Sequence, residues 1–385
     1  MKSQPFLVAV ALTASVTVAA PSDWPCFRGP NHDGTLAVPF TLTRGEPQVL
    51  WRAKLGSGNG SQAVVAGRVF TAANGQKDRV VCLDARTGQR VWSVSDFRAD
   101  GNSTPSVESN RVYVLGHGRS FPEAACVSAA DGKALWTAAL PKGGGPDHYG
   151  LAGSPRVWRD LVFFNVAGGA AVRKDSGEVA WAHDGHTAYA TPVVFDARGR
   201  PAVAFFTGDQ LIARDARSGR ELWTIPWKTE LEVNACDPLF VGDRVFVCSA
   251  YKRARSFYDV SGASPRLLWE STRNGDGHAY ASGFIQGEGI FFFTGGSFAR
   301  VDMAGGDVLW ESRGGNSVLL LGGSLIRVSE KGELTAGPFD PSRKVEPVLR
   351  AQVLSGTTRA VPAYWAGQLY VRNEAGDLVC LKISE

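Results

Sequence analysis

A phrase that ends in tryptophan recurs along the chain and limits the fold more than any other feature. It reads "LDARTGQRVW", "SAADGKALW", "RDARSGRELW" and close variants of these. The tryptophans that end the phrase lie 41 to 46 residues apart: Trp51, Trp92, Trp136, Trp181, Trp223, Trp269 and Trp310. A period in the low forties, with four strand-like stretches in each unit, is typical of the blades of a β-propeller.

Each unit divides into four short strands in the same way. In residues 104–139 the strands are "TPSVES", "RVYVLG", "AACVSA" and "ALWTAA". The tight turn "ADGK" joins the last two, because Asp-Gly readily adopts the positive φ angles that a hairpin turn needs. We expect the tryptophan of the outer strand to pack against the neighbouring blade and cover its turn, which is a structural role and not a ligand-stacking one.

Counting the units predicts an all-β fold, an eight-bladed β-propeller of four-stranded antiparallel blades. Six units run from Ser61 to Trp310, and a seventh, "SVLLLGGSLIRVSEKGELTAGPFDPSRKVEPVLR", lacks the tryptophan. The eighth, "VPAYWAGQLYVRNEAGDLVCLKI", has only three strands, so "PQVLWRAKL" near the N-terminus is expected to supply the fourth and close the ring. The expected domains are a signal peptide (1–20), a leader segment (21–48) and one propeller (49–385).

The N-terminus predicts export. Lys2 precedes the apolar stretch "FLVAVALTASVTVAA", which resembles a secretory signal cleaved near Ala19 or Ala20. No Cys stands at that point, so no lipid anchor is expected, and the mature chain is expected to contain no transmembrane segment. The expected location is periplasmic or extracellular. The 41 basic and 37 acidic residues form no basic stripe, which argues against a nucleic-acid partner.

The six cysteines fall into two groups that matter for the fold. Cys82, Cys126 and Cys380 occupy the same strand position in three units, so we interpret them as small buried residues. Cys236 and Cys248 flank one hairpin. Their spacing allows a cross-strand disulfide, and the sequence leaves open whether it forms.

The loops that enter the inner strands are polar and aromatic, and propeller geometry brings them to one mouth of the central channel. We expect any cofactor or ligand to bind there, because the axial funnel is the deep concave site of a propeller. The residues expected to form this ring are Asn59, Asn102, His148, His186, Tyr189, Asn234, His278, Tyr280 and Arg359. Three readings stay open for its histidines: closing the channel through hydrogen bonds, binding a ligand, or binding a metal.

One entry loop also offers oxygen ligands. Glu232, Asn234 and Asp237 are residue types that suit a hard cation such as Ca²⁺. The alternative is a solvated loop in which Asp237 caps the strand that follows.

The repeat units resemble the PQQ-like repeat of eight-bladed quinoprotein dehydrogenases and of the outer-membrane assembly lipoprotein of the BAM complex. This resemblance covers about residues 49–385, and the opening "DWPCFRGPNHDG" resembles the leader of exported PQQ-binding-like propellers. It implies an exported propeller for which PQQ with Ca²⁺ is one cofactor to consider. The chain has neither the adjacent Cys-Cys pair found in many quinoprotein dehydrogenases nor a Cys-x-x-Cys-His haem motif.

Two functions follow from the resemblance. The first is a binding or scaffold protein of the cell envelope that uses its channel mouth or blade edges toward a protein or small-molecule partner. The second is a PQQ-dependent alcohol-type dehydrogenase, in which the quinone accepts a hydride and a carboxylate takes the hydroxyl proton. We favour the first, because the repeat specifies the fold and not an activity. No catalytic residue is assigned.

Overall fold

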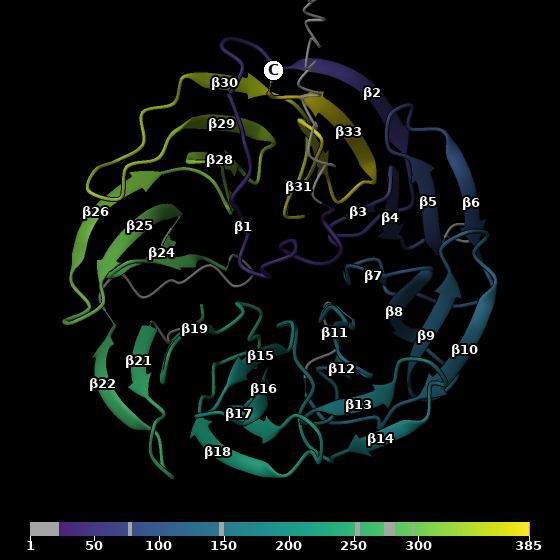
Figure 1. Ribbon diagram of the computed structural model, residues 1–385, viewed down its shortest axis with the longest axis vertical. Coiled ribbons are helices and arrows are strands. Elements are labelled where there is room, and N and C mark those ends of the chain that lie inside the picture. The colour runs from purple at the N-terminus through teal and green to yellow at the C-terminus, as the bar shows by residue number, and fades with distance from the viewer. Residues whose placement is uncertain are drawn as a thin grey trace, which may run out of the picture.

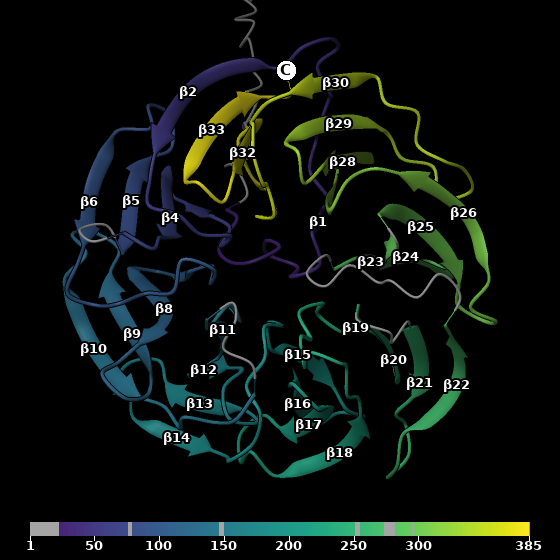
Figure 2. The same ribbon diagram turned by 180° about the vertical axis from the view of Figure 1, so that it is seen from behind.

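The computed structural model describes residues 23–75, 79–145, 150–250, 255–272, 282–294 and 296–384. Within these ranges the regular structure is entirely β, with 33 strands in eight sheets and no helix. Accordingly, no membrane-spanning helix occurs in them. The sheets stand radially around a centre as eight blades (Figures 1 and 2), which confirms the predicted fold.

Blades 1 to 4 follow one another along the chain, each running from an inner to an outer strand. Blade 1 comprises β3 (Ala63–Val65), β4 (Arg68–Ala72), β5 (Val80–Asp84) and β6 (Arg90–Val94). Blade 2 comprises β7 (Ser106–Glu108), β8 (Arg111–His117), β9 (Pro122–Ser128) and β10 (Ala134–Ala139). Blade 3 comprises β11 (Arg156–Trp158), β12 (Leu161–Phe164), β13 (Ala170–Arg173) and β14 (Val179–Ala182). Blade 4 comprises β15 (Val193–Asp196), β16 (Pro201–Phe206), β17 (Gln210–Asp215) and β18 (Glu221–Pro226).

Blades 5 to 8 complete the ring, and the last two also use strands from the N-terminal region. Blade 5 comprises β19 (Leu239–Val241), β20 (Arg244–Cys248), β21 (Arg255–Asp259) and β22 (Arg266–Ser271). Blade 6 comprises β23 (Phe284–Gln286), β24 (Gly289–Thr294), β25 (Ser297–Asp302) and β26 (Val308–Arg313). Blade 7 comprises β1 (Thr35–Leu36), β27 (Ser317–Leu321), β28 (Ser324–Val328), β29 (Glu333–Pro338) and β30 (Leu349–Gln352). Blade 8 comprises β31 (Ala363–Trp365), β32 (Gln368–Arg372), β33 (Asp377–Lys382) and β2 (Gln48–Lys54).

The ring closes in blade 8 as expected. Strand β2 pairs antiparallel with β33, with Trp51 opposite Cys380 and Gln48 opposite Lys382. An N-terminal strand and the last strand of the chain therefore share one sheet, near the C-terminus in Figure 1.

The docking tryptophans join each blade to the next. The indole N–H donates to a backbone carbonyl of the following blade at 2.9 to 3.3 Å in six cases: Trp51, Trp92, Trp136, Trp181, Trp269 and Trp310. Five of the rings also cover a turn glycine so closely that an added Cβ would lie 2.6 to 2.8 Å away, at Gly88, Gly132, Gly177, Gly219 and Gly306. Blade 7 instead has the buried aliphatic Leu349 in its outer strand. The structural role predicted for these tryptophans is confirmed.

The hydrophobic core lies between successive blades. One cluster, for example, joins Phe70, Cys82 and Trp92 of blade 1 to Val112 and Ala125 of blade 2. Cys82, Cys126 and Cys380 are buried as predicted.

The leader, residues 23–47, crosses the centre of the ring (Figure 1). Trp24 exchanges backbone hydrogen bonds with Val64 of blade 1, and the Pro25 carbonyl accepts from Val107 of blade 2. On the other side, the Arg28 guanidinium donates to the carbonyl of Gly283, which precedes blade 6, and β1 pairs parallel with β27 of blade 7. The leader thus contacts the inner strands on both sides of the channel.

Candidate functional site

The alternation of antiparallel strands gives the propeller two different faces. The loops that enter the inner strands share one face with the loops between second and third strands, and we name it the entry-loop face. The turns covered by the docking tryptophans lie on the opposite face. Most of the candidate residues are therefore on the entry-loop face, as the sequence predicts.

Three of the predicted ring residues meet in one cavity of about 550 Å³, which we name the mouth pocket. Asn59, Asn102 and Arg359 come from the entry loops of blades 1, 2 and 8. The second–third strand loops of the same blades add other polar lining residues: Asn74, Arg79, His117 and Glu374. Arg98 and Asp100 complete the charged lining.

A buried carboxylate organises this pocket. Asp100 is 3% exposed and accepts three hydrogen bonds, from the backbone N–H of Asn102 at 2.8 Å, from that of Leu151 at 2.7 Å, and from His117 Nε2 at 2.8 Å. The Asn102 amide oxygen in turn accepts from both the backbone and the side-chain nitrogen of Asn59. These bonds hold the loops of blades 1, 2 and 3 together.

Arg359 is held by carboxylates at the rim of the pocket. Its Nε donates to Glu330 Oε1 at 2.9 Å, and its Nη1 lies 3.6 Å from Glu374 Oε2. The position predicted for ligand binding thus carries a cation that is already partly neutralised.

His186 lies at a different part of the entry-loop face. Its Nδ1 is 3.1 Å from Glu232 Oε2, without the geometry of a hydrogen bond, and Glu232 also faces Lys228 at 3.5 Å. The backbone on either side of His186 pairs with Gly144 of the long loop between blades 2 and 3. His186 therefore lies in a charged cluster that belongs to blades 3 to 5.

Tyr189 and Asn234 are buried and not open to solvent. The Asn234 side-chain amide donates to the backbone carbonyls of Thr207, Gly208 and Trp227, and the backbone carbonyl of Asn234 accepts from the Tyr189 N–H. In this arrangement the Asn234 side chain ties neighbouring loops together.

Asp237 lies in the interior beside the leader. It accepts a hydrogen bond from the Thr191 N–H at 2.8 Å. Burial raises the pKa of Asp237 to about 6, although Arg28 and Arg156 act in the opposite direction. Burial likewise lowers the pKa of Arg156 to about 10 and raises the pKa of the Cys26 thiol to about 12. Cationic and acidic groups are therefore enclosed together at the centre of the ring.

The candidate cation ligands Glu232, Asn234 and Asp237 have different protein partners, as described above. Among the residues that the structure describes, no group of three or more His, Cys, Asp or Glu side chains is arranged to hold a metal ion. We therefore derive no chemical step through a cation or a quinone. His148, His278 and Tyr280 lie outside the described residues, and their role stays a prediction.

Cys236 and Cys248 are free thiols in the structure, and both are buried. Two effects raise the pKa of Cys236: a hydrogen bond between the two thiols, which is the larger effect, and burial. Both thiols are therefore reduced in this state, and the raised pKa favours the protonated form of Cys236.

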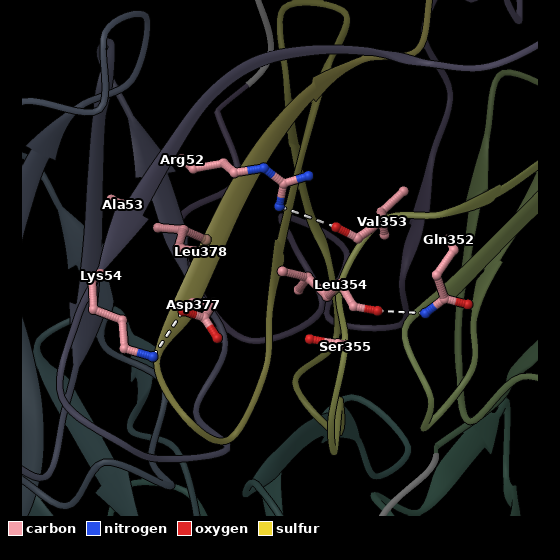
Figure 3. Close-up of a pocket in the computed structure, with 9 residues that line it drawn as sticks. All are labelled: Arg52, Ala53, Lys54, Gln352, Val353, Leu354, Ser355, Asp377 and Leu378. Atoms are coloured by element: carbon pink, nitrogen blue, oxygen red, sulfur yellow. Dashed lines mark hydrogen bonds and ion pairs between the residues drawn. The ribbon is translucent and has the colours of Figure 1, made fainter.

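A second cavity, of about 660 Å³, lies at the seam between blades 7 and 8 (Figure 3). Its polar groups bond to the protein, and the bond of Arg52 crosses the seam. Lys54 pairs with Asp377 at 2.8 Å, Arg52 donates to the Val353 carbonyl at 3.2 Å, and Gln352 donates to the Leu354 carbonyl. We interpret this groove as part of the ring closure.

Sequence reasoning missed Arg79, Arg98, Asp100 and His117 of the mouth pocket. It considered only positions close to the inner strands. Arg79 follows a second strand and His117 is the last residue of one, and strand alternation alone places these positions on the entry-loop face. That rule could have found them.

The comparisons with known proteins agree with this architecture. A family model described as outer membrane protein assembly factor BamB matches residues 42–183 and 170–322. The outer membrane protein assembly factor BamB of Burkholderia pseudomallei is 27% identical over 371 residues, covering 84% of this chain and 88% of that protein.

Solved structures show the same fold at lower identity. BamB from Moraxella catarrhalis superposes with a TM-score of 0.63 at 15% identity, covering 88% of this chain and 98% of that one. The quinohemoprotein alcohol dehydrogenase from Comamonas testosteroni gives a TM-score of 0.60 at 13% identity, covering 94% and 80%. Because the family model matches well over half of its length, the chain belongs to the family described as outer membrane protein assembly factor BamB.

Proposed function

We propose that this chain is a binding scaffold of the cell envelope that contacts a protein partner through its entry-loop face and acts in the assembly of outer membrane proteins. The observation that carries the proposal is the family match over residues 42–322, together with a relative named as an outer membrane protein assembly factor. An exported, periplasmic location fits both the signal-like N-terminus and that relative.

Two exposed hydrophobic side chains support the choice of face. Most of the large exposed ones lie on or just before the outer strands: Val49, Leu50, Val91, Leu135, Val179, Leu267, Leu309 and Val348. The other two are Phe121, 53% exposed in the loop between β8 and β9, and Leu231, 45% exposed in the entry loop of blade 5. Both lie on the entry-loop face, where aromatic and aliphatic anchors suit a protein interface.

Genetic complementation tests this proposal. Deleting the gene in the native host should lower the amount of β-barrel protein in the outer membrane, and the parent chain should restore it. The double variant Phe121→Asp with Leu231→Asp should restore it poorly, because charged side chains at an interface core weaken association. Leu309→Asp is the matched control, since it adds the same charge at an exposed outer-strand position. Normal β-barrel levels in the deletion strain would contradict the proposal.

A second assay separates the scaffold from the dehydrogenase. Purified chain is mixed with PQQ and Ca²⁺, and reduction of an acceptor dye by short alcohols is followed. A scaffold gives no turnover above the protein-free control. Turnover that depends on both PQQ and the chain would establish the alternative function, an alcohol-type dehydrogenase. Cell fractionation and N-terminal sequencing of the mature chain test the expected export and the cleavage near Ala19 or Ala20.

A further inference from the structure

The mouth pocket has more free hydrogen-bond donors than acceptors. Three of its acceptor groups are already used by the protein: Asp100 receives three hydrogen bonds, the Asn102 amide oxygen two, and the Asn74 amide oxygen one from the Gly101 N–H. A ligand that fits this lining must therefore be rich in acceptors.

The free donors are cationic. Arg79 and Arg98 both line the pocket, and neither side chain forms an ion pair or hydrogen bond with a residue that the structure describes. Arg359, in contrast, is engaged by Glu330 and Glu374. Two guanidinium groups without carboxylate partners in one cavity are suited to oxyanions, because their N–H groups match the spacing of the oxygens.

His117 adds an acceptor in a fixed orientation. Its Nε2–H is held by the buried Asp100 carboxylate, so in the neutral ring Nδ1 carries the lone pair and accepts a hydrogen bond from a ligand. Because the Asp100 oxygens are occupied by three donors, this carboxylate orients the imidazole and repels an incoming anion less than an exposed one would.

This acceptor distinguishes between anions. His117 Nδ1 receives a hydrogen bond only from a ligand that carries a donor of its own. A carboxylate or sulfate offers only acceptors near neutral pH. Hydrogen phosphate also carries a hydroxyl group that can donate, and a phosphate monoester carries one in its singly protonated form.

We propose that the mouth pocket is a phosphate-binding site for free phosphate or for a phosphate monoester group, with Arg79 and Arg98 as the principal ligands and His117 Nδ1 as the oriented acceptor for the phosphate hydroxyl. The inference goes beyond the proposed scaffold function and does not depend on it. The seam groove of Figure 3 contrasts with this pocket, because its Lys, Arg and Gln donors are bonded to the protein.

Calorimetric titration of the purified full chain with inorganic phosphate tests the site. The parent should bind phosphate, and the double variant Arg79→Gln with Arg98→Gln should bind it roughly 10- to 100-fold more weakly, as expected for lost charge-assisted hydrogen bonds. Arg44→Gln is the control, because Arg44 is exposed and lies in the leader outside the pocket. Melting temperatures of all variants should match that of the parent, which separates a lost ligand from a lost fold.

Two further arms identify the anion and its source. Sulfate should bind more weakly than phosphate, and equal binding would overturn the role given to His117. Sedimentation with phosphatidylcholine vesicles, with and without phosphatidic acid, then follows. Binding that needs phosphatidic acid and is lost in the double variant supports the site and identifies a lipid headgroup, whereas binding of inorganic phosphate alone supports it with a soluble ligand. No phosphate binding by the parent, or equal binding by the double variant, would overturn the proposal, and either result leaves the complementation experiment unaffected.

Discussion

Replacing Trp136 by Ala should destabilise the ring through one inter-blade contact. Trp136 is 9% exposed, covers the turn at Gly177 in blade 3, and donates its indole N–H to the Lys174 carbonyl at 2.9 Å. A tryptophan side chain buries about 150–250 Å², which at about 25 cal/mol per Å² corresponds to roughly 4–6 kcal/mol. Since Ala keeps part of that burial, the expected loss is about 3–5 kcal/mol.

Thermal unfolding measures this loss. An unfolding entropy of about 2.1 cal/mol/K per residue gives about 0.8 kcal/mol/K for 385 residues, so Tm should fall by about 4–6 °C. Trp136→Phe keeps an aromatic ring on Gly177 but loses the indole hydrogen bond, and should cost roughly 1–2 kcal/mol.

The neighbouring residue provides the control. Leu135 lies on the same strand and is 47% exposed, so Leu135→Ala should change stability by no more than about 0.5 kcal/mol. If Trp136→Ala and Leu135→Ala lowered Tm equally, the inter-blade docking contact would not be the source of the stability assigned to it.

Three other perturbations test the closure, the leader and the buried acid. Deleting residues 21–56 removes β2 from blade 8 and should produce aggregation in size-exclusion chromatography, whereas a stable monomer would contradict the closure. Arg28→Ala removes a buried side chain that donates to the carbonyls of Asp33 and Gly283. It should lower the free energy of unfolding by about 2–4 kcal/mol and make the leader accessible to limited proteolysis. An unchanged Tm and digestion pattern would argue against that anchor. In the folded chain the pKa of Asp237 is about 6, above its usual 3.8. Protonated Asp237 therefore contributes at most roughly 3 kcal/mol to the free energy of unfolding. This contribution is complete below about pH 4 and is lost as the pH rises through 6. The Tm of the parent relative to Asp237→Asn should therefore fall between pH 4 and 7, and a constant difference would refute the raised pKa.

The fold was predictable because its information is local and repeated. Each turn glycine and docking tryptophan recurs at a similar spacing, so one unit explains the others, and the incomplete eighth unit reveals the closing strand. The path of the leader was not predictable in this way. Arg28 meets Gly283 across 255 residues, and nothing repeated in the sequence indicates that contact.

The sequence predicted which face of the propeller carries the candidate site, but only some of the residues that line it. Asn59, Asn102 and Arg359 do share a cavity, because equivalent loops of neighbouring blades converge. Tyr189 and Asn234 occupy similar loop positions yet are buried, since the backbone carbonyls around them take up the Asn234 amide. Side-chain direction within a loop depends on such long-range hydrogen bonds, which spacing along the chain does not encode.

The closure of blade 8 also determines when the ring can be finished. Strand β2 is synthesised early, but its partner β33 ends at Lys382, so about 330 residues must follow before the two can pair. At roughly 5–20 residues per second, β2 remains unpaired for about 15 to 65 seconds, with the apolar Val49 and Leu50 in an open strand edge. Every chain that is cut or stalled before blade 8 is complete presents this same free strand. A chaperone or protease that recognises unpaired β2 would thus distinguish an incomplete chain from a closed propeller.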